Sequence, residues 1–397
     1  MKILFVNDIP FNPSYGGIEQ VTDKIARTLL ERGHQVFYLC GKVHKRDTIL
    51  DYQYPTKLFV LPYDDFFKSK ENIRYYNLLI KEQCIDIVIN QRGLDCWQNE
   101  VLLSNYEVKK VSVLHSTPNR DLLFCTNLIL TAPKSSLDYV KYTLKKILYP
   151  ILRYRIRRRV SMSISKQYSF ICRNSDAVVL LSNNDKKDFL SYLHNCHPKL
   201  LKGIPNPNSY PRQQLDLHLK EKMILYVGRL SSNDKCPLLL LKMWKSLYPK
   251  FHDWQLVFIG DGADRVVMED YIYKNKIERA YLLGQKNEVS KYYKKASIVC
   301  LTSIFEGWGM ALTEGMQFGC IPLTFNNYGA ASDIIDDGIN GFLIPAYNKK
   351  KYTMYLAELM QNDSKRERMA MAAYSKSMNF DIENIVDQWE ELFSIIK

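Results

Sequence analysis

Short apolar runs rich in Val, Ile, Leu and Phe alternate along the chain with longer amphipathic stretches. A strand of a parallel sheet is buried on both faces and has such a run, and the helix that crosses back over the sheet is amphipathic. The pattern therefore predicts an α/β protein with parallel sheets. The expected strands are Ile3–Val6, Gln35–Leu39, Ile87–Asn90, Val111–Leu114, Ala177–Leu181, Met223–Val227, Gln255–Ile259, Ala280–Leu283, Ile298–Leu301, Ile321–Thr324 and Phe342–Ile344.

The alternation of strands and helices restarts after Pro205-Asn206-Pro207-Asn208. The residue before a proline avoids the helical conformation, so this segment is interpreted as a linker. A chain of 397 residues is also too long for one ordinary hydrophobic core. We therefore expect two Rossmann-like domains, residues 1–205 and 206–380. The last stretch, 381–396, has Trp389 and Phe393 on one side and is predicted to form an amphipathic helix.

The net charge of +13 at pH 7 implies attraction to nucleic acid, to a phosphorylated small molecule or to an acidic membrane surface. Nine cysteines, odd in number and scattered, include no Cys-x-x-Cys pair, so reduced and mostly buried thiols are the simplest interpretation. The first apolar run is too short for a signal peptide, and no window holds the ~18 uninterrupted apolar residues that span a bilayer. The sequence therefore predicts a cytoplasmic protein that is not integral to the membrane.

The most informative stretch runs from Leu301 to Gly315. A strand ends, a loop with glycines follows and a helix begins, which places main-chain N–H groups and the positive end of a helix dipole at the carboxyl edge of the sheet. Ligands bind at this edge in open α/β sheets. Glu306 and Glu314 bracket the turn, and one could hold a sugar and the other a ribose, with a diphosphate between them. Both could equally be ordinary first-turn glutamates that the helix dipole favours.

A second group of charges follows the strand that ends at Val227. Arg229 and Lys235 could neutralise a diphosphate leaving group, or they could be two surface cations among the 55 Lys and Arg residues. No Asp-x-Asp motif, the usual short handle for a metal-bound diphosphate, occurs in the chain. Arg229, Lys235 and helix amides would then take the place of the metal, and no metal or other cofactor is expected.

Two features of the first half lie at expected strand ends. Gly16 and Gly17 would let a ligand approach the backbone, or they could form only a flexible turn. His115 closes the strand Val111–Leu114 and would point into a cleft between the domains, although a lone histidine there is often structural. The Gly-x-Gly-x-x-Gly pattern and the Walker lysine motif are absent, which disfavours a nicotinamide dehydrogenase.

These motifs, in this order, resemble glycosyltransferase family four, the retaining nucleotide-sugar enzymes with the GT-B fold. The resemblance covers nearly the whole chain and is strongest from Ile224 to Pro345. It rests on Gly16-Gly17-Ile18-Glu19, His115, Ile204-Pro205-Asn206, Gly228-Arg229 with Lys235, Gly260-Asp261-Gly262, the Glu306-x7-Glu314 arrangement and Asp337-Gly338-Ile339-Asn340-Gly341. It implies two Rossmann-like domains whose parallel sheets face each other across a cleft. Residues 206–380 would bind the donor, and the helix 381–397 would cross back onto the acceptor-side domain.

The resemblance implies a retaining, metal-independent hexosyltransferase that uses a nucleotide sugar, most often a uridine nucleotide. The acceptor would be a saccharide or lipid-linked glycan, in polysaccharide or lipopolysaccharide biosynthesis. Glu306 would hold donor-sugar hydroxyls and Glu314 the ribose. Arg229 and Lys235 would bind the diphosphate, and His115 would contact the sugar near the reacting carbon. The donor would also be contacted by Gly16, Gly17, Gly307, Trp308, Gly309 and Met310.

Three positions depart from the usual family pattern. Cys236 stands where glycine is common, Gly315 where alanine is common, and Thr302 where proline often precedes the serine. None removes a charged group, so they bear on the shape of the donor pocket rather than on the reaction class. By the same resemblance, the preferred mechanism is front-face substitution assisted by the leaving phosphate.

The segment 141–166 is strongly basic, and no acidic residue occurs between Asp138 and Asp176. Basic residues interleaved with apolar ones can lie on an anionic membrane, with about 1 kcal/mol per cation. Pro150 would break or kink a helix there. A solvated basic face is the alternative, but we favour peripheral association with the cytoplasmic face of the membrane. The cations are Lys141, Lys145, Lys146, Arg153, Arg155, Arg157, Arg158, Arg159 and Lys166.

Three other functions compete with glycosyl transfer. A GT-B sugar-nucleotide epimerase would turn over the donor without an acceptor and would want further acid and base groups. A sugar-nucleotide-binding protein without turnover is disfavoured by the intact charged residues. Nucleic-acid binding would give steep salt dependence, but no recognised binding motif accompanies the basic segment, so nucleic acid is not expected as a partner.

Overall fold

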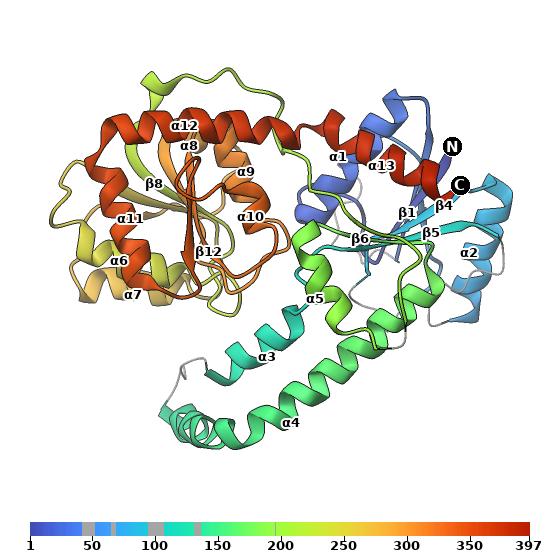
Figure 1. Cartoon of the computed structure of the whole chain (residues 1–397), viewed down its shortest axis with the longest axis horizontal. Helices are drawn as coiled ribbons and strands as arrows, with labels where there is room; N and C mark the ends of the chain where they lie inside the picture. The colour runs from blue at the N-terminus through green and yellow to red at the C-terminus, as the bar shows by residue number, and fades with distance from the viewer. Residues whose placement is uncertain (42–51, 65–68, 94–106, 131–135, 195) are drawn as a thin grey trace. The chain divides into compact units, whose positions relative to one another are not determined.

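The computed structural model describes residues 1–41, 52–64, 69–93, 107–130, 136–194 and 196–397, without the side chains of 126–152 (Figure 1). The chain forms two compact units. The first comprises Met1–Pro118, Arg159–Ser209 and Asp381–Lys397, and the second comprises Asn119–Arg158 and Tyr210–Phe380.

The first unit is built on a seven-stranded parallel sheet of order β3-β2-β1-β4-β5-β6-β7. The central strand β1 pairs with β2 on one side and β4 on the other, so that Val6 lies opposite both Leu39 and Asn90. The strand order reverses between β1 and β4, and such a switch point is where ligands bind in open sheets. The strands are β1 (Lys2–Asn7), β2 (Gln35–Cys40), β3 (Leu58–Val60), β4 (Ile87–Asn90), β5 (Lys109–Leu114), β6 (Ala177–Leu180) and β7 (Leu201–Gly203).

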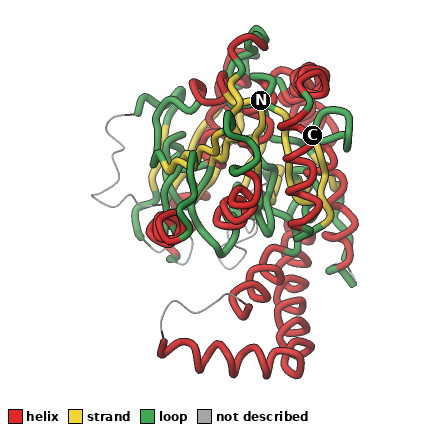
Figure 2. The backbone as a smooth tube through the Cα atoms, turned by 90° about the vertical axis from the view of Figure 1, so that its left-hand side faces the viewer, coloured by secondary structure: helices red, strands yellow, loops and turns green. Residues whose placement is uncertain are grey.

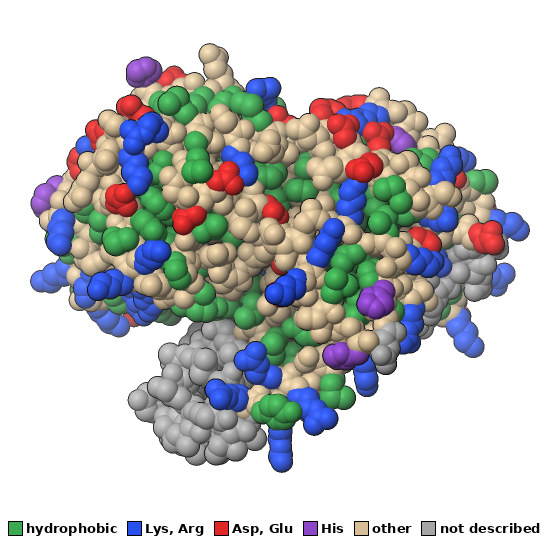
Figure 3. All heavy atoms as spheres, viewed as in Figure 1, with side chains coloured by type: hydrophobic (Ala, Val, Ile, Leu, Met, Phe, Trp, Pro, Cys, Tyr) green, Lys and Arg blue, Asp and Glu red, His purple; other side chains and the backbone are tan. Residues whose placement is uncertain are grey.

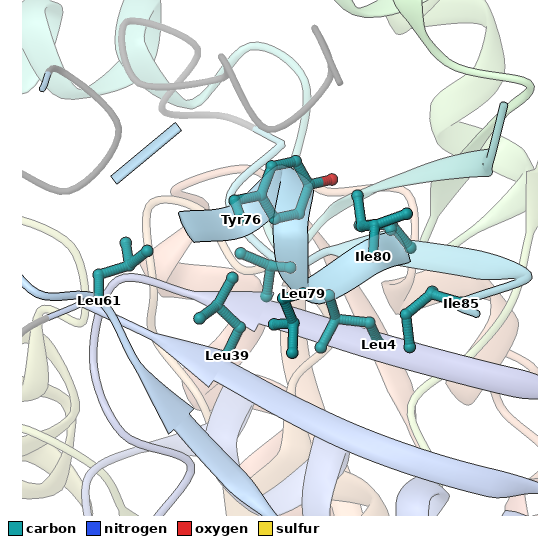
Figure 4. Close-up of a cluster of buried hydrophobic side chains, with 9 residues drawn as sticks. Leu4, Leu39, Leu61, Tyr76, Leu79, Ile80 and Ile85 are labelled. Atoms are coloured by element: carbon teal, nitrogen blue, oxygen red, sulfur yellow. The ribbon is translucent and has the colours of Figure 1, made fainter. Parts of the chain in front are cut away.

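Helix α2 (Lys70–Gln83) closes part of the core of this unit. Its buried Tyr76, Leu79 and Ile80 pack onto apolar side chains of the sheet (Figure 4). The sheet contributes Leu4, Val6, Leu39 and Val88, with Leu61 and Ile85 beside them. Further helices of the unit are α1 (Gly17–Glu31), the short α5 (Lys186–Ser191) with the 3₁₀ turn Asn183–Asp185 before it, and α13 (Ile382–Ile396).

The last helix, α13, belongs to the first unit and packs against α1. Trp389 and Phe393 are buried, as the predicted amphipathic pattern requires. Arg32, just after α1, donates hydrogen bonds to three carboxylates of α13 at 2.5–2.6 Å. The carboxylates are those of Glu383, Asp387 and Glu390. An apolar face and one multiply bonded arginine therefore hold α13 in place.

The second unit has a six-stranded parallel sheet of order β10-β9-β8-β11-β12-β13, which reverses between β8 and β11. Its strands are β8 (Glu221–Val227), β9 (Gln255–Ile259), β10 (Ala280–Leu282), β11 (Ala296–Cys300), β12 (Ile321–Asn326) and β13 (Phe342–Pro345). The helices after β8 are α6 (Pro237–Leu247), α7 (Arg265–Lys274), α8 (Ser290–Lys295), α9 (Met310–Gln317), α10 (Ala331–Ile334), α11 (Lys349–Gln361) and α12 (Asp363–Ser377). One 3₁₀ turn, Leu217–Leu219, precedes β8, and another, Met378–Phe380, follows α12.

Two helices, α3 (Arg120–Leu130) and α4 (Ser136–Asn174), are inserted between β5 and β6. The sequence predicts one domain over 1–205, whereas Asn119–Arg158 groups with the second unit. The 39-residue α4 would span ~58 Å if straight, which is far longer than any strand of the first sheet. Only its last part, with Ile164, Tyr168 and Ile171 buried, belongs to the core of the first unit. The helix continues through Pro150 and changes direction along its course (Figure 2), as helices that contain a proline do.

The expected strands are all present, with ends that differ by up to two residues. The sequence does not predict β3 and β7, which have three residues each and lie at the two edges of the first sheet. Runs of this length show no periodicity. No helix within the described residues is long and apolar enough to cross a bilayer. The eight cysteines that the structure describes are free thiols, and four of them are buried.

Candidate active site

The loop between β11 and α9 forms the centre of the candidate site in the second unit. Strand β11 ends at Cys300, and α9 begins at Met310 after Gly309. Gly309 has a φ of 99°, and a Cβ there would lie 3.2 Å from the Tyr328 hydroxyl, so both conformation and space favour glycine. The loop thus delivers the N-terminus of α9 to the carboxyl edge of the sheet, as the sequence predicts.

Glu306 lies on this loop and is nearly buried, with 8% of its surface exposed. The Lys235 ammonium donates hydrogen bonds to both carboxylate oxygens, each at 2.7 Å. The Ser303 hydroxyl donates a third at 2.6 Å. A buried carboxylate needs such partners because the protein interior solvates charge poorly. Glu306 is therefore paired with one of the two cations that the sequence analysis selected, and is not a solvated first-turn glutamate.

Loops after three neighbouring strands hold Glu306 in place. The Thr302 hydroxyl donates to the Cys236 carbonyl at 2.9 Å, and the Ile304 N–H donates to the Asp234 carbonyl at 2.7 Å. From the loop after β12, the Asn327 amide donates to the carbonyls of Ser303 and Ile304 at 3.0 and 2.7 Å. The sequence analysis did not select Ser303 or Asn327. The two residues reach Glu306 because β8, β11 and β12 are neighbours in the sheet, and no local pattern in the sequence indicates this.

Arg229 lies two residues beyond β8, with its side chain 75% exposed. Its guanidinium donates to Asp234 at 2.8 Å, and the buried Tyr226 hydroxyl donates to the Arg229 carbonyl at 3.1 Å. Arg229 and Lys235 thus follow the same strand end, as the sequence predicts, and the strand order reverses beside this strand, between β8 and β11. In this structure each cation is paired with a carboxylate.

The glycines near Arg229 have a packing role. A Cβ on Gly260 would lie 2.1 Å from the Gly228 carbonyl oxygen, and a Cβ on Gly262 would lie 2.5 Å from the Leu230 carbonyl oxygen. Both glycines also have a positive φ. The loops after β8 and β9 can therefore approach each other only with glycine at these positions. The Gly-x-Gly at 260–262 thus serves the contact between two loops.

Glu314 lies on α9 and accepts a hydrogen bond from the Tyr293 hydroxyl at 2.8 Å. The next residue, Gly315, packs so closely that a Cβ would meet the Val299 side chain at 2.8 Å. This contact explains why glycine replaces the alanine of the usual pattern. α9 therefore lies directly on β11, which fixes the direction of its N-terminus.

Trp308 is 2% exposed, and its ring packs edge-on against Phe380 with centroids 5.1 Å apart. Its side chain is therefore part of the core of the second unit. The main chain of Trp308 is therefore the part of this residue that could make the donor contact that the sequence predicts. The amides of Gly307, Gly309 and Met310 belong to the same turn, and their contact with a donor stays a prediction.

Cys236 adopts a left-handed conformation, with φ 50° and ψ 46°, immediately before α6. L-residues other than glycine and asparagine rarely adopt this conformation. Glycine, the usual residue of the family at this position, adopts this backbone conformation without strain. The thiol donates to the Ser232 carbonyl at 3.2 Å, and burial raises its pKa to about 12.

In the first unit, Gly16 and Gly17 precede and begin α1. A Cβ on Gly16 would lie 2.9 Å from a carboxylate oxygen of Glu19, whereas nothing lies within 4 Å of one on Gly17. Glu19 is buried and accepts from the Asn7 amide, the last residue of β1, at 2.9 Å. Burial raises the pKa of Glu19. This carboxyl group ties the glycine turn to the switch point of the first sheet.

His115 follows β5 directly, and its Nε2 is hydrogen-bonded to the side chain of Gln91, which follows β4. Burial disfavours the imidazolium and lowers the pKa of His115 to about 4. The ring is therefore neutral near pH 7 and can offer only neutral hydrogen bonds. Gln91, which holds the ring, has no signal in the sequence.

Two family profiles divide the chain between them. "Glycosyltransferase Family 4" matches residues 15–207, and "Glycosyl transferases group 1" matches residues 211–376. The crystal structure of a mutant of TarM from S. aureus superposes with a TM-score of 0.73 over 99% of each chain, at 13% sequence identity. The chain belongs to the family-four type of GT-B glycosyltransferases.

Two relatives of this glycosyltransferase are themselves named as glycosyltransferases. An uncharacterized glycosyltransferase of Haemophilus influenzae is 25% identical over 95% of this chain and 96% of its own length. A Campylobacter jejuni N-acetyl-D-galactosaminyltransferase, named for a diNAcBac-PP-undecaprenol-linked substrate, is 27% identical over 62% of this chain and 64% of its own length.

The residues brought together in the second unit of the glycosyltransferase are Glu306, Lys235, Arg229 and the N-terminus of α9. Gly16, Gly17 and His115 lie in the first unit, at the carboxyl ends of its strands. No group of three or more His, Cys, Asp or Glu residues in the described part of the chain could hold a metal ion. Metal independence stays a prediction.

Proposed function

We propose that this glycosyltransferase moves a hexose from a uridine diphosphate sugar to a saccharide or lipid-linked glycan, with retained anomeric configuration. The observation that carries the proposal is the buried pair of Lys235 and Glu306 beside the N-terminus of α9. Cations and helix amides stabilise a departing diphosphate. Supporting the substrate classes, the TarM structure holds UDP, and the Campylobacter relative is named for an undecaprenol-linked glycan.

The reaction develops negative charge on the diphosphate and positive charge on the sugar ring. Lys235, Arg229 and the α9 amides would stabilise the first charge, Glu306 would hold sugar hydroxyls, and Glu314 would hold the ribose. The acceptor oxygen would form its bond on the face where the bond to the donor phosphate breaks, which retains the configuration. The acceptor proton would pass to the leaving phosphate oxygen. His115, neutral near pH 7, would position the sugar by a hydrogen bond.

Donor binding would exchange partners at Arg229. Its pair with Asp234 is solvent-exposed on the arginine side, and exposed pairs contribute only ~0–1 kcal/mol. A phosphate that accepts two hydrogen bonds from one guanidinium gains more than this. Arg229 can therefore leave Asp234 at little cost, whereas the buried Lys235–Glu306 pair would stay together and meet the donor as a unit.

A thermal-shift panel of UDP, GDP and ADP and their sugar conjugates tests the donor. UDP should raise the melting temperature of the wild type and of Glu367→Ala, an exposed glutamate near the amino ends of the strands, but not of Glu314→Ala. A shift with GDP or ADP instead would correct the base. No shift with any nucleotide at millimolar concentration would contradict the donor site.

Transfer itself is tested by NMR of the product formed from the selected donor and a panel of saccharide and undecaprenyl-linked acceptors. The anomeric centre should keep the configuration of the donor, and the rate should survive excess EDTA. An inverted product would contradict retention, and loss of activity in EDTA would contradict metal independence. Conversion of the donor to its epimer without any acceptor would favour the epimerase.

We also propose that the described part of the basic segment lies on an anionic membrane at the cytoplasmic face. Arg155, Arg159, Met162 and Lys166 are spaced for one face of α4, and all four are exposed. Tyr154 beside them is 71% exposed. Lys and Arg side chains gather over the described part of α4 (Figure 3). The side chains of Lys141, Lys145 and Lys146 lie outside the described residues.

Sedimentation with vesicles tests this surface. Vesicles with about 30% phosphatidylserine should bind the wild type, and those of phosphatidylcholine should not. Arg155→Glu with Arg159→Glu should weaken binding by ~10-fold or more, since each cation contributes about 1 kcal/mol. The matched control, Lys349→Glu with Lys350→Glu, makes the same charge change at exposed positions of α11. Equal loss in both variants, or tighter binding to RNA than to vesicles, would contradict the proposal.

A further inference from the structure

The hydroxyl of Tyr293, on α8, is the hydrogen-bond donor to Glu314 at 2.8 Å. The tyrosine has no exposed surface. Burial and the neighbouring carboxylate raise the pKa of Tyr293 well above its usual value, so the phenol keeps its proton and always donates. A charge-assisted hydrogen bond of this kind is stronger than one between neutral groups. The carboxylate of Glu314 is therefore held by a donor that solvent does not reach.

The position of Tyr293 is held from three sides. Its ring is nearly parallel to that of Phe318, with centroids 6.0 Å apart and planes at 11°. The ring of Tyr210 meets it edge-on at 6.2 Å. The ammonium of Lys220 donates to the Tyr293 carbonyl at 2.9 Å and to the Ala296 carbonyl at 2.7 Å. The phenol therefore cannot follow Glu314 if that side chain rotates.

We infer that Tyr293 is a positioning residue that orients Glu314 to accept hydrogen bonds from the ribose hydroxyls of the donor. The inference rests on the proposed function, in which Glu314 binds the ribose. A carboxylate has two oxygens, and a fixed phenol on one of them sets the plane in which the group faces a ligand. A vicinal diol needs such a fixed acceptor geometry, since both hydroxyls must be met together. Tyr293 thus contributes to the preference for a ribonucleotide without touching it.

Isothermal titration with UDP and with 2′,3′-dideoxy-UDP tests this role. The ratio of the two dissociation constants measures how much the ribose hydroxyls contribute. In the wild type we expect a ratio of ~10 or more, because a hydrogen bond to a charged group is worth more than a neutral one. Tyr293→Phe keeps the ring and removes the hydroxyl. It should lower the ratio ~3-fold or more and leave binding of the dideoxy nucleotide within about twofold of wild type.

Two variants serve as controls. Glu314→Gln should abolish most of the ratio. Tyr352→Phe removes a hydroxyl from an equally buried tyrosine that donates to the carbonyls of Leu301 and Leu323 and does not bond to Glu314. This variant should keep the wild-type ratio, even where its melting temperature falls.

The outcomes separate the inference from the function on which it rests. An unchanged ratio in Tyr293→Phe overturns the role of Tyr293 alone. Equal weakening of both nucleotides in that variant shows a merely structural role and also overturns it. A wild type that binds both nucleotides equally overturns the ribose role of Glu314 and this inference with it. A wild type that binds neither contradicts the uridine donor.

Discussion

Removal of Lys235 should destabilise the second unit, because the buried carboxylate of Glu306 would lose its main hydrogen-bond partner. At 2.7 Å and an effective dielectric constant of about 20, the attraction in the pair is ~6 kcal/mol. Desolvation of the two groups offsets most of this gain, and the side chain of Lys235 is 22% exposed. Ser303 still donates to the carboxylate after the substitution. We therefore expect Lys235→Met to cost ~3 kcal/mol, at the low end for a broken buried pair.

A double-mutant cycle measures the coupling within the pair. The variants are Lys235→Met, Glu306→Gln and the double variant, each unfolded in urea without ligand. Tryptophan fluorescence reports mainly on the second unit, because Trp244, Trp254 and Trp308, three of the five tryptophans, lie there. The double variant should be more stable than the sum of the single effects predicts, with a coupling free energy of ~2 kcal/mol. Both single variants should also lower kcat by ~100-fold or more.

The exposed pair of Lys222 and Asp253 in the same unit is the control. The equivalent cycle with Lys222→Met and Asp253→Asn should give a coupling of ~0–1 kcal/mol. A coupling below ~0.5 kcal/mol for Lys235 and Glu306 would mean that the pair behaves like a surface ion pair. Burial would then add nothing measurable to the attraction between Lys235 and Glu306.

Three further predictions concern other parts of the chain. The folded-state pKa of His115, about 4, lies below the unfolded value near 6.5, so its stabilising contribution is present above pH 6.5 and is lost as the pH falls toward 4. Over this pH range the free energy of unfolding should fall by up to ~3 kcal/mol more in the wild type than in His115→Gln. Equal decreases of the two proteins in urea unfolding would contradict this prediction. Because Cys236 has a positive φ, Cys236→Gly should leave the free energy of unfolding unchanged or raise it by ~0.5 kcal/mol, whereas Cys236→Val should lower it by ~2 kcal/mol. Equal melting temperatures of the two variants would show that the backbone at this position is not strained. Arg32→Ala should cost ~1–2 kcal/mol and speed amide hydrogen exchange in α13, whereas unchanged exchange would show that the apolar face alone holds the helix.

Most of the fold could be predicted because its strands are long buried runs. β1 and β8 each contain four consecutive buried apolar residues, and β11 contains three that are followed directly by the buried Leu301, which gives a clear signal. β3 and β7 could not be predicted, since three residues at a sheet edge have neither length nor a buried face. The grouping of Asn119–Arg158 with the second unit could not be predicted either, because it depends on contacts between residues far apart in the sequence.

The residues of the candidate site divide in the same way. Glu306, Lys235 and Arg229 are charged residues just past strand ends, and this position could be inferred from local pattern. Trp308 shows the limit of such reasoning. It lies between two glycines of the key loop, yet its side chain turns into the core against Phe380. Whether a loop side chain faces a ligand or the interior depends on the neighbouring layer, which a local motif does not contain.

The partners of the two glutamates were invisible in the sequence for a further reason. Asn327 reaches the Glu306 loop only because β12 lies beside β11, and Tyr293 reaches Glu314 only because α8 and α9 both pack on β11. Neither residue stands out among the asparagines and 27 tyrosines of the chain. A bond between side chains from different loops is set by sheet order, and sheet order is a property of the fold. The order of motifs along the chain can therefore indicate which charges meet, while the neutral groups that orient those charges become identifiable only in the folded unit.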